Sequence, residues 1–137
     1  MATKAEAYVD TSALIAFADR SDSYHSTFRR LFAKPPSLLT TTLVVAEGHG
    51  WFLRRYDRNR ALQFLAMIEA MTPLIVVAVG PEEQAAAVDL LRRFSDQDLT
   101  LADAVGLHVS KTHRVRTIWS TDFHLGLTGV ALVIGRG

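Results

Sequence analysis

The sequence of 137 residues contains no cysteine and no long apolar run, and its positive and negative charges nearly cancel. The absence of cysteine excludes a disulfide framework and a thiolate metal site, which is usual in a reducing cytoplasm. Apolar runs such as Leu74 to Val79 are far shorter than the roughly 20 residues of a membrane helix. The first residues lack the charged and apolar regions of a signal peptide. We therefore expect a cytoplasmic protein that does not associate with membranes.

The net charge is +1 and the pI is about 8.2. A nucleic-acid-binding domain that relies on overall charge usually has a pI above about 9. Any site for a polyanion must therefore come from local clustering of basic residues. Hydrophobic residues make up 49% of the chain, which is enough for one core, and the length is that of a single domain. We expect one domain over residues 1–137, without internal repeats.

Short apolar segments typical of strands alternate along the chain with segments of helical periodicity. We expect strands at 6–10, 37–41, 74–79, 117–120 and 130–134. We expect helices at 12–18, 25–33, 42–56, 60–71, 80–94 and 100–112, with 121–128 as a connection. Ser12, Thr41 or Thr42, and Thr100 are good residues to cap three of these helices. Strands separated by helices predict a three-layer α/β/α fold with a central, mainly parallel sheet.

Four acidic residues stand in otherwise apolar surroundings. Asp10 ends the first strand, Glu47 lies on an apolar helix, Asp103 lies in the first turn of the last helix, and Asp122 follows the strand 117–120. In a parallel sheet the carboxyl ends of the strands and the amino ends of the helices share one edge, where ligands bind. We therefore expect the four carboxylates to converge there.

Each acid also has a simple structural explanation. Asp103 follows Thr100 at the spacing of a capping box, Asp10 suits a turn, Glu47 suits a solvated helix face, and Asp122 suits a loop. The four taken together weaken these explanations, because two carboxylates about 4 Å apart repel by about 1–4 kcal/mol at effective dielectric constants of 80 down to 20. Protons or a cation must offset that repulsion. Ligands that are all oxygens select a hard ion such as Mg²⁺ or Mn²⁺.

The surroundings of these acids form an ordered set of motifs. They are Val9-Asp10-Thr11-Ser12-Ala13-Leu14, Val45-Ala46-Glu47, Asp96-Gln97-Asp98-Leu99-Thr100-Leu101-Ala102-Asp103-Ala104 and Ser120-Thr121-Asp122-Phe123-His124. In this order the set resembles a PIN-domain ribonuclease, and within that family the VapC toxin branch of bacterial toxin–antitoxin pairs. The resemblance covers essentially the whole chain.

The resemblance implies a Mg²⁺ or Mn²⁺ site formed by Asp10, Glu47, Asp103 and Asp122, with Asp98 as an additional ligand. It implies metal-assisted hydrolysis of RNA phosphodiester bonds, in which Asp10 and Asp103 hold the ion. Glu47 and Asp122 would complete the cage or orient the attacking water. A VapB-type antitoxin as partner and a homodimer are also implied.

Basic residues follow Glu47 on the same predicted helix. Arg54 and Arg55 lie two turns beyond it, and Arg58 comes soon after. We expect them to bind the RNA backbone or an acidic tail of the antitoxin. The alternative is a solvated helix end whose cations offset the helix dipole.

The hydroxyl, imidazole and aromatic side chains are given smaller roles at the predicted site. Thr11 and Ser12 could donate hydrogen bonds to a ligand carboxylate or to phosphate. No histidine has the spacing of a metal ligand, so none is assigned to metal. We interpret the aromatic residues at helical spacing as core or dimer contacts and not as platforms for bases; they are Phe28, Phe32, Trp51 and Phe52.

Two alternatives to a ribonuclease remain open at this point. One is a non-catalytic PIN-like module in which the acids form only a charged surface. The other is a phospho-acceptor domain of the receiver or haloacid-phosphatase type, which also places an Asp at a strand end. The phosphatase requires a second Asp two residues later, where Ser12 stands, and the receiver requires paired acids before the acceptor strand. The metal-dependent endoribonuclease is therefore our preferred prediction.

Overall fold

The structure is a computed structural model that describes residues 4–133. Within them, five parallel strands form one sheet in the order β3-β2-β1-β4-β5. The strands are β1 (Ala7–Val9), β2 (Leu38–Thr41), β3 (Leu74–Val77), β4 (Thr117–Trp119) and β5 (Ala131–Leu132). Ala7 of β1 is in register with Leu38 on one side and Thr117 on the other. β1 is thus the central strand, and Asp10 follows it directly.

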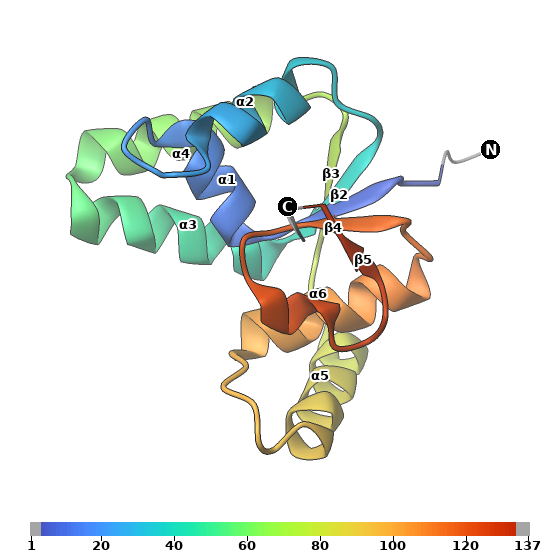
Figure 1. Ribbon diagram of the computed structural model, residues 1–137. Helices are drawn as coiled ribbons and strands as arrows, with labels where there is room; N and C mark the ends of the chain where they lie inside the picture. The colour runs from blue at the N-terminus through green and yellow to red at the C-terminus, as the bar shows by residue number, and fades with distance from the viewer. Residues whose placement is uncertain (1–3, 134–137) are drawn as a thin grey trace.

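Helices lie on both sides of this sheet. In the described part of the chain they are α1 (Thr11–Ala18), α2 (His25–Ala33), α3 (Thr42–Arg55), α4 (Arg58–Ala70), α5 (Pro81–Arg93), α6 (Leu101–Thr112) and the 3₁₀ helix η1 (Phe123–Gly126). Figure 1 shows α1 to α4 gathered to one side of the strands, and α5 and α6 together on another. The predicted α/β/α architecture is confirmed. Among the described residues no helix is both long enough and apolar enough to cross a membrane.

The core lies between the central strands and the helices that cover them. Tyr8, Leu14, Phe28 and Leu38 are essentially inaccessible to solvent. Helix α6 is buried from Asp103 to Leu107, as its nearly all-round apolar sequence predicts. These central elements end at the sheet edge where the acids were expected, so the best-packed part of the molecule supports that edge.

A glycine allows α6 to approach β1 closely. A Cβ atom at Gly106 would lie 2.6 Å from the hydroxyl oxygen of Tyr8, a distance that no real side chain tolerates. Tyr8 stands two residues before Asp10, and Gly106 stands three residues after Asp103. The close packing at Gly106 therefore helps to bring these two acids to the same place.

The first helix starts earlier than predicted. Ser12 was expected to cap it, but the cap is Asp10, whose carboxylate accepts a hydrogen bond from the backbone N–H of Ser12 at 3.4 Å. Helix α4 likewise starts at Arg58, because Asp57 caps it by accepting from the backbone N–H of Arg60 at 2.8 Å. The expected caps Thr41 and Thr100 are confirmed.

The strand ends also differ from the prediction. β3 stops at Val77 and not at residue 79, because the N–H of Val79 donates to the hydroxyl of Thr42 and not to a neighbouring strand. The predicted strand 130–134 is reduced to Ala131–Leu132, and its last residue lies outside the described part. The connection 121–128 contains η1, a helix that the sequence did not predict and that Asp122 caps.

Candidate active site

All four predicted acids line one pocket of about 360 Å³. Asp10 reaches it from the end of β1, Glu47 from α3, Asp103 from the first turn of α6, and Asp122 from the start of η1. The remaining walls are made by Thr11, Ser12, Ile15, Trp51, Arg54 and Thr100. The structure thus brings the four carboxylates together as the geometry of a parallel sheet predicts, whereas their roles in metal binding and catalysis stay predictions.

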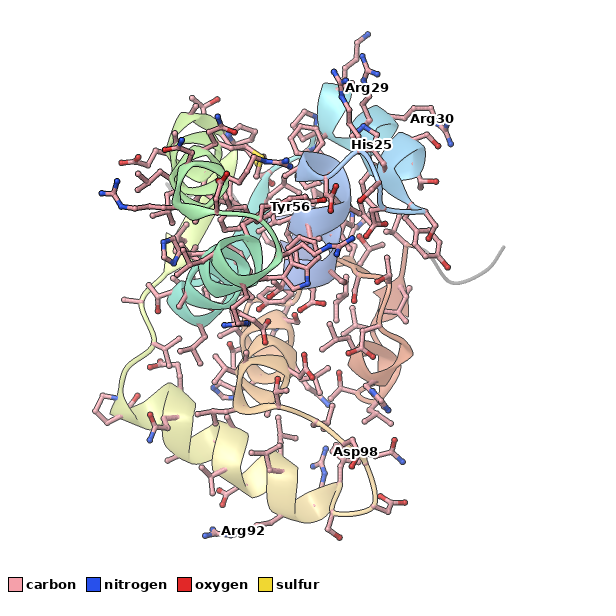
Figure 2. The ribbon with its side chains drawn as sticks, turned by 90° about the vertical axis from the view of Figure 1, so that its left-hand side faces the viewer. His25, Arg29, Arg30, Tyr56, Arg92 and Asp98 are labelled. Atoms are coloured by element: carbon pink, nitrogen blue, oxygen red, sulfur yellow. The ribbon has the colours of Figure 1, made fainter. Side chains whose placement is uncertain are left out.

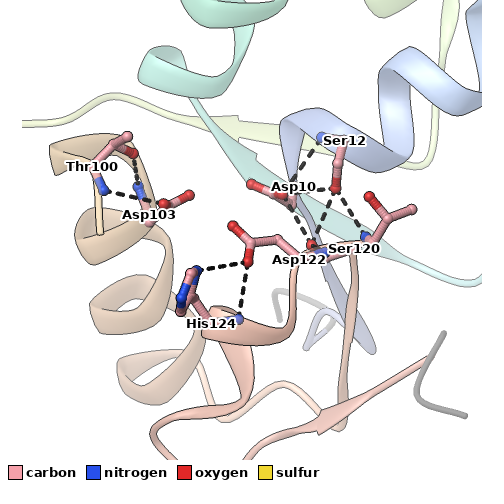
Figure 3. Close-up of polar contacts among 8 residues, drawn as sticks. Asp10, Ser12, Thr100, Asp103, Ser120, Asp122 and His124 are labelled. Atoms are coloured by element: carbon pink, nitrogen blue, oxygen red, sulfur yellow. Dashed lines mark hydrogen bonds and ion pairs between the residues drawn. The ribbon is translucent and has the colours of Figure 1, made fainter. Parts of the chain in front are cut away.

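Asp10 is held by two hydroxyl groups (Figure 3). Its Oδ2 accepts from Ser12 Oγ at 2.9 Å and from Ser120 Oγ at 3.0 Å. Each hydroxyl oxygen accepts in turn from the backbone, Ser12 from the N–H of Thr121 at 2.9 Å and Ser120 from the N–H of Asp122 at 2.8 Å. Both serine hydroxyls thus hold the Asp10 carboxylate through the same oxygen, Oδ2.

Burial makes Asp10 a weak acid. Its residue is only 5% exposed, and this burial, with a further contribution from the charge of Asp103, raises its pKa to about 6 despite the hydrogen bonds from Ser12 and Ser120. The pKa of Asp103 is also raised, first by burial and then by the charge of Asp122, against the opposing hydrogen bonds from Thr100. The pocket therefore disfavours several negative charges at once, and a cation would stabilise them.

Asp103 takes part in the N-terminal cap of α6 and also lines the pocket. Its Oδ2 accepts from the backbone N–H of Thr100 at 3.1 Å, and the Thr100 hydroxyl accepts from the N–H of Asp103 at 3.0 Å. This reciprocal pair is the capping box that the spacing predicted. The cap fixes the direction of the carboxylate, so the two explanations of Asp103 are compatible.

Asp122 and Glu47 are each held by one side chain. Asp122 Oδ1 lies 3.0 Å from Nδ1 of His124 and accepts from the backbone N–H of His124 at 2.9 Å (Figure 3). The hydroxyl of Thr11 donates to Oε1 of Glu47 and so joins α1 to α3. Thr11 and Ser12 therefore bind carboxylates, which is one of the two uses that the sequence suggested for them.

The structure does not bring every predicted residue to the pocket. Asp98 is exposed on the loop that joins α5 to α6, where Figure 2 labels it, and it does not line the pocket. Arg54 lines the pocket, but Arg55 and Arg58 are exposed residues outside its lining. The predicted roles of Asp98, Arg55 and Arg58 therefore stay predictions, and of these basic residues only Arg54 lines the pocket.

Four residues at the site were missed or given another role. Ser120 and His124 were not singled out, although Ser120 ends the strand before Asp122 and His124 follows Asp122 by two residues. Trp51 was interpreted as a core or dimer contact, and Ile15 was not considered. Helical spacing could have found Trp51, because it stands four residues after Glu47 and therefore on the same face of α3.

The donor set suits a hydrated divalent ion. In residues 4–133 no three acidic or imidazole side chains are close enough to form a ready metal cage. Mg²⁺, however, commonly keeps several waters and is held by one or two carboxylates, so an open pocket lined by carboxylates is appropriate for it. The raised pKa values of Asp10 and Asp103 supply the electrostatic reason for such an ion to bind.

Comparison with known proteins places this geometry in a family. The family model for the PIN domain matches residues 7–129. The 23S rRNA-specific endonuclease VapC20 of Mycobacterium tuberculosis is 28% identical over 124 residues, which cover 89% of this chain and 93% of that protein.

Solved structures agree with the sequence match. The crystal structure of M. tuberculosis VapC20, described as a sarcin-ricin loop cleaving toxin, aligns with a TM-score of 0.84 at 25% identity over 91% of this chain and 96% of that one. Two further structures share the fold. PAE2754 from Pyrobaculum aerophilum aligns with a TM-score of 0.65 at 20% identity over 96% of this chain and 90% of that one. A toxin–antitoxin complex from Klebsiella pneumoniae aligns with a TM-score of 0.63 at 17% identity over 93% of this chain and 95% of that one. The chain therefore belongs to the PIN domain family, as a ribonuclease of the VapC type.

Proposed function

We propose that this pocket hydrolyses RNA phosphodiester bonds with Mg²⁺ or Mn²⁺, and that the chain is the toxin of a VapBC-type pair acting in the cytoplasm. The observation that carries the proposal is the convergence of Asp10, Glu47, Asp103 and Asp122 from four different elements on one pocket. The raised pKa values of Asp10 and Asp103 support a cation there. The similarity to VapC-type endonucleases supports RNA as the substrate.

In this proposal Asp10 and Asp103 hold the ion. Ser12 and Ser120 both donate to Oδ2 of Asp10 and would orient this carboxylate toward an ion in the pocket. Thr100 fixes Asp103 through the capping box. When bound, such an ion lowers the pKa of its water and neutralises charge that develops on the phosphoryl oxygens.

Glu47 and Asp122 complete the site or orient the attacking water. Both carry a partner that fixes their direction, Thr11 for Glu47 and His124 for Asp122. The reaction adds water to phosphorus, breaks one P–O ester bond, and gives the leaving oxygen a proton. No serine or histidine nucleophile is required for this hydrolysis.

The proposal extends to partners. The name of the similar M. tuberculosis protein makes 23S rRNA the first RNA to test, and the fold shared with a toxin–antitoxin complex supports a VapB-type antitoxin that silences the enzyme. Arg54 at the pocket, with Arg55 and Arg58 on the surface nearby, would bind RNA or the antitoxin. We also propose a homodimer.

The decisive experiment compares RNA cleavage by the wild type, Asp10→Asn and Asp98→Asn in buffers with and without Mg²⁺ or Mn²⁺. Asp98 is the matched control, because it is an acid that does not line the pocket. We expect cleavage only with metal, loss in Asp10→Asn and retention in Asp98→Asn. Absence of cleavage of any RNA, together with no Mn²⁺ binding by calorimetry, would instead favour the non-catalytic module.

A further inference from the structure

The pocket has an apolar wall that the chemistry of the acids does not explain. Helices α1 and α3 both start at the carboxyl edge of the sheet, and the bond between Thr11 and Glu47 joins them close to that edge. Four residues further along each helix stand Ile15 and Trp51, and both line the pocket. One helical turn advances about 5.4 Å, so this wall lies about one turn from the carboxylates.

Trp51 is only half-buried, although it belongs to a cluster of rings. Its indole lies 4.9 Å from the ring of Phe52 at 82° and 6.1 Å from that of Tyr56 at 68°. Such edge-to-face contacts orient a ring without covering it as a parallel partner would. Phe52 itself is only 1% exposed and anchors the cluster in the core. The protein therefore fixes the indole while part of it faces the pocket.

Arg54 lies on the same face of α3, seven residues after Glu47, and also lines the pocket. Its guanidinium bends back along the helix, since a Cβ atom at Gly50 would lie 3.0 Å from Nη1 of Arg54. Among residues 4–133 no carboxylate oxygen lies within salt-bridge distance of this guanidinium. A cation that lines an acidic pocket without pairing with its acids is free to bind a phosphate.

We propose that Trp51 stacks against a base of the RNA beside the scissile phosphate, and that Arg54 binds the neighbouring phosphate. This proposal rests on the ribonuclease function above and adds the residues that position its substrate. Aromatic side chains hold unpaired bases by stacking, and removal of one such contact weakens binding by about tenfold or more. The wall lies about one helical turn from the acids, which leaves room for a ribose between the cleaved bond and the stacked base. Trp51 packs against the core, as expected from the sequence, and the proposal adds a second role for the part of its ring that faces the pocket.

Fluorescence offers a direct test, because the chain has two tryptophans and Trp119 is only 4% exposed. The probe is a series of RNA oligonucleotides that the wild type cleaves, each lacking one base near the cleavage site. The protein is Asp10→Asn, which binds without cutting. We expect RNA to quench the fluorescence of Trp51, and the loss of one particular base to abolish the quenching and weaken binding by about tenfold.

Kinetics of two matched pairs complete the test. Trp51→Ala should raise KM about tenfold with a smaller change in kcat, and Trp51→Phe should bring KM most of the way back. The control is Leu53→Ala, at an exposed residue of α3 outside the pocket lining, which should change neither constant. Arg54→Gln should raise KM, whereas Arg29→Gln, at an exposed residue of α2 outside the pocket lining, should not. The melting temperature of each variant reports on folding.

The outcomes separate this proposal from the function on which it depends. If the wild type cleaves RNA but Trp51→Ala keeps its KM and no missing base alters quenching, the stacking proposal is wrong and the ribonuclease stands. If no RNA is bound or cut, both fail. If Trp51→Ala weakens only the binding of a VapB-type antitoxin, the wall is a protein-binding surface and the proposal is also wrong. The oligonucleotide series is measured on a protein with unaltered Trp51 and Arg54, so it remains valid even if the variants at these two positions do not fold.

Discussion

Two buried aspartates at opposite ends of α1 have opposite electrostatics. Asp10 at the start and Asp19 at the end are 5% and 4% exposed. The pKa of Asp10 is raised by burial to about 6. At Asp19 burial acts in the same direction, but hydrogen bonds from Ser21 and Tyr56 and the charge of Arg60 outweigh it and lower the pKa. The two residues have similar exposure, yet Asp10 lies deep in the protein and Asp19 close to its surface, so Asp19 stays charged easily while a charge on Asp10 favours a counter-ion.

The depth of burial and the partners of the two carboxylates together explain the difference. Asp19 Oδ1 accepts from the backbone N–H and the hydroxyl of Ser21 at 3.0 and 2.8 Å, and the Tyr56 hydroxyl lies 2.9 Å from both of its oxygens. The guanidinium of Arg60 lies over the Tyr56 ring at 4.2 Å from its centroid. The two serine hydroxyls that hold Asp10 both donate to its Oδ2, and other carboxylates line the same pocket. Asp19 therefore connects the end of α1 to Tyr56 and the start of α4, whereas the surroundings of Asp10 favour the binding of a cation.

The largest expected effect is on activity, and it tests the contrast between Asp10 and Asp19. Asp10→Asn should reduce RNA cleavage by more than about a hundredfold, because the site loses the carboxylate proposed to hold the ion. Its melting temperature without metal should be equal to or higher than that of the wild type, because one of two repelling charges is gone. Asp103→Ala should act in the same direction on cleavage. Full activity in both variants would remove these acids from the active site.

The pH dependence of stability should differ in sign between the two aspartates. Asp10 has a folded-state pKa of about 6 against 3.8 for the free side chain, so in this range the native state binds more protons than the unfolded one. Stability without metal should therefore fall as the pH rises from about 4 to about 6, by about 3 kcal/mol from this group. Asp19, with its lowered pKa, contributes stability above the unfolded pKa and loses it as the pH falls through the folded one.

The measurement compares the wild type with Asp10→Asn by thermal unfolding without metal from pH 4 to pH 7. The variant should gain stability relative to the wild type as the pH rises, and Mn²⁺ should cancel that gain by stabilising only the wild type. A constant difference between the two proteins across this pH range would contradict the raised pKa of Asp10. Asp19→Asn serves as the control, because its deficit should not shrink as the pH rises.

Removal of Asp19 should affect stability and leave the chemistry intact. Asp19→Ala should lower the free energy of unfolding by about 1.5–3 kcal/mol, because hydrogen bonds to a charged group are lost. At a temperature where the variant is folded, kcat for RNA should match that of the wild type. Urea unfolding and initial rates give the two numbers. A large loss of kcat in the folded variant would show that the two ends of α1 are coupled.

The sequence was sufficient for the sheet, the helices and the four acids because each is a local pattern. A strand that ends on Asp10 and a capped helix that places Asp103 in its first turn determine which edge of a parallel sheet these residues share. Contacts between distant segments were not predictable in this way. Nothing local to Tyr56 indicates that it binds Asp19, and nothing local to Ser120 indicates that its hydroxyl reaches Asp10.

Two sequence-based assignments were incomplete for the same physical reason. Ser12 was assigned the cap of α1, but Asp10 takes that position, and the Ser12 hydroxyl is used to hold the Asp10 carboxylate and the backbone of Thr121. Trp51 was interpreted as a core or dimer contact; it does pack against the core, and the same residue also borders the pocket. Periodicity shows which residues share a face, whereas the tertiary fold decides whether that face meets the core or a cavity.

The smallest expected effect concerns the hydroxyls that orient Asp10. Ser120→Ala should lower kcat by about tenfold, because Asp10 Oδ2 loses one of its two hydroxyl donors and the carboxylate can turn away from the pocket. The half-buried N–H of Asp122 also loses its acceptor, which should cost about 1 kcal/mol of stability. Ser21→Ala is the matched change beside Asp19, and it should alter stability alone. Equal rates for Ser120→Ala and the wild type would mean that Ser12 suffices to orient Asp10, and that Ser120 serves only the turn before η1.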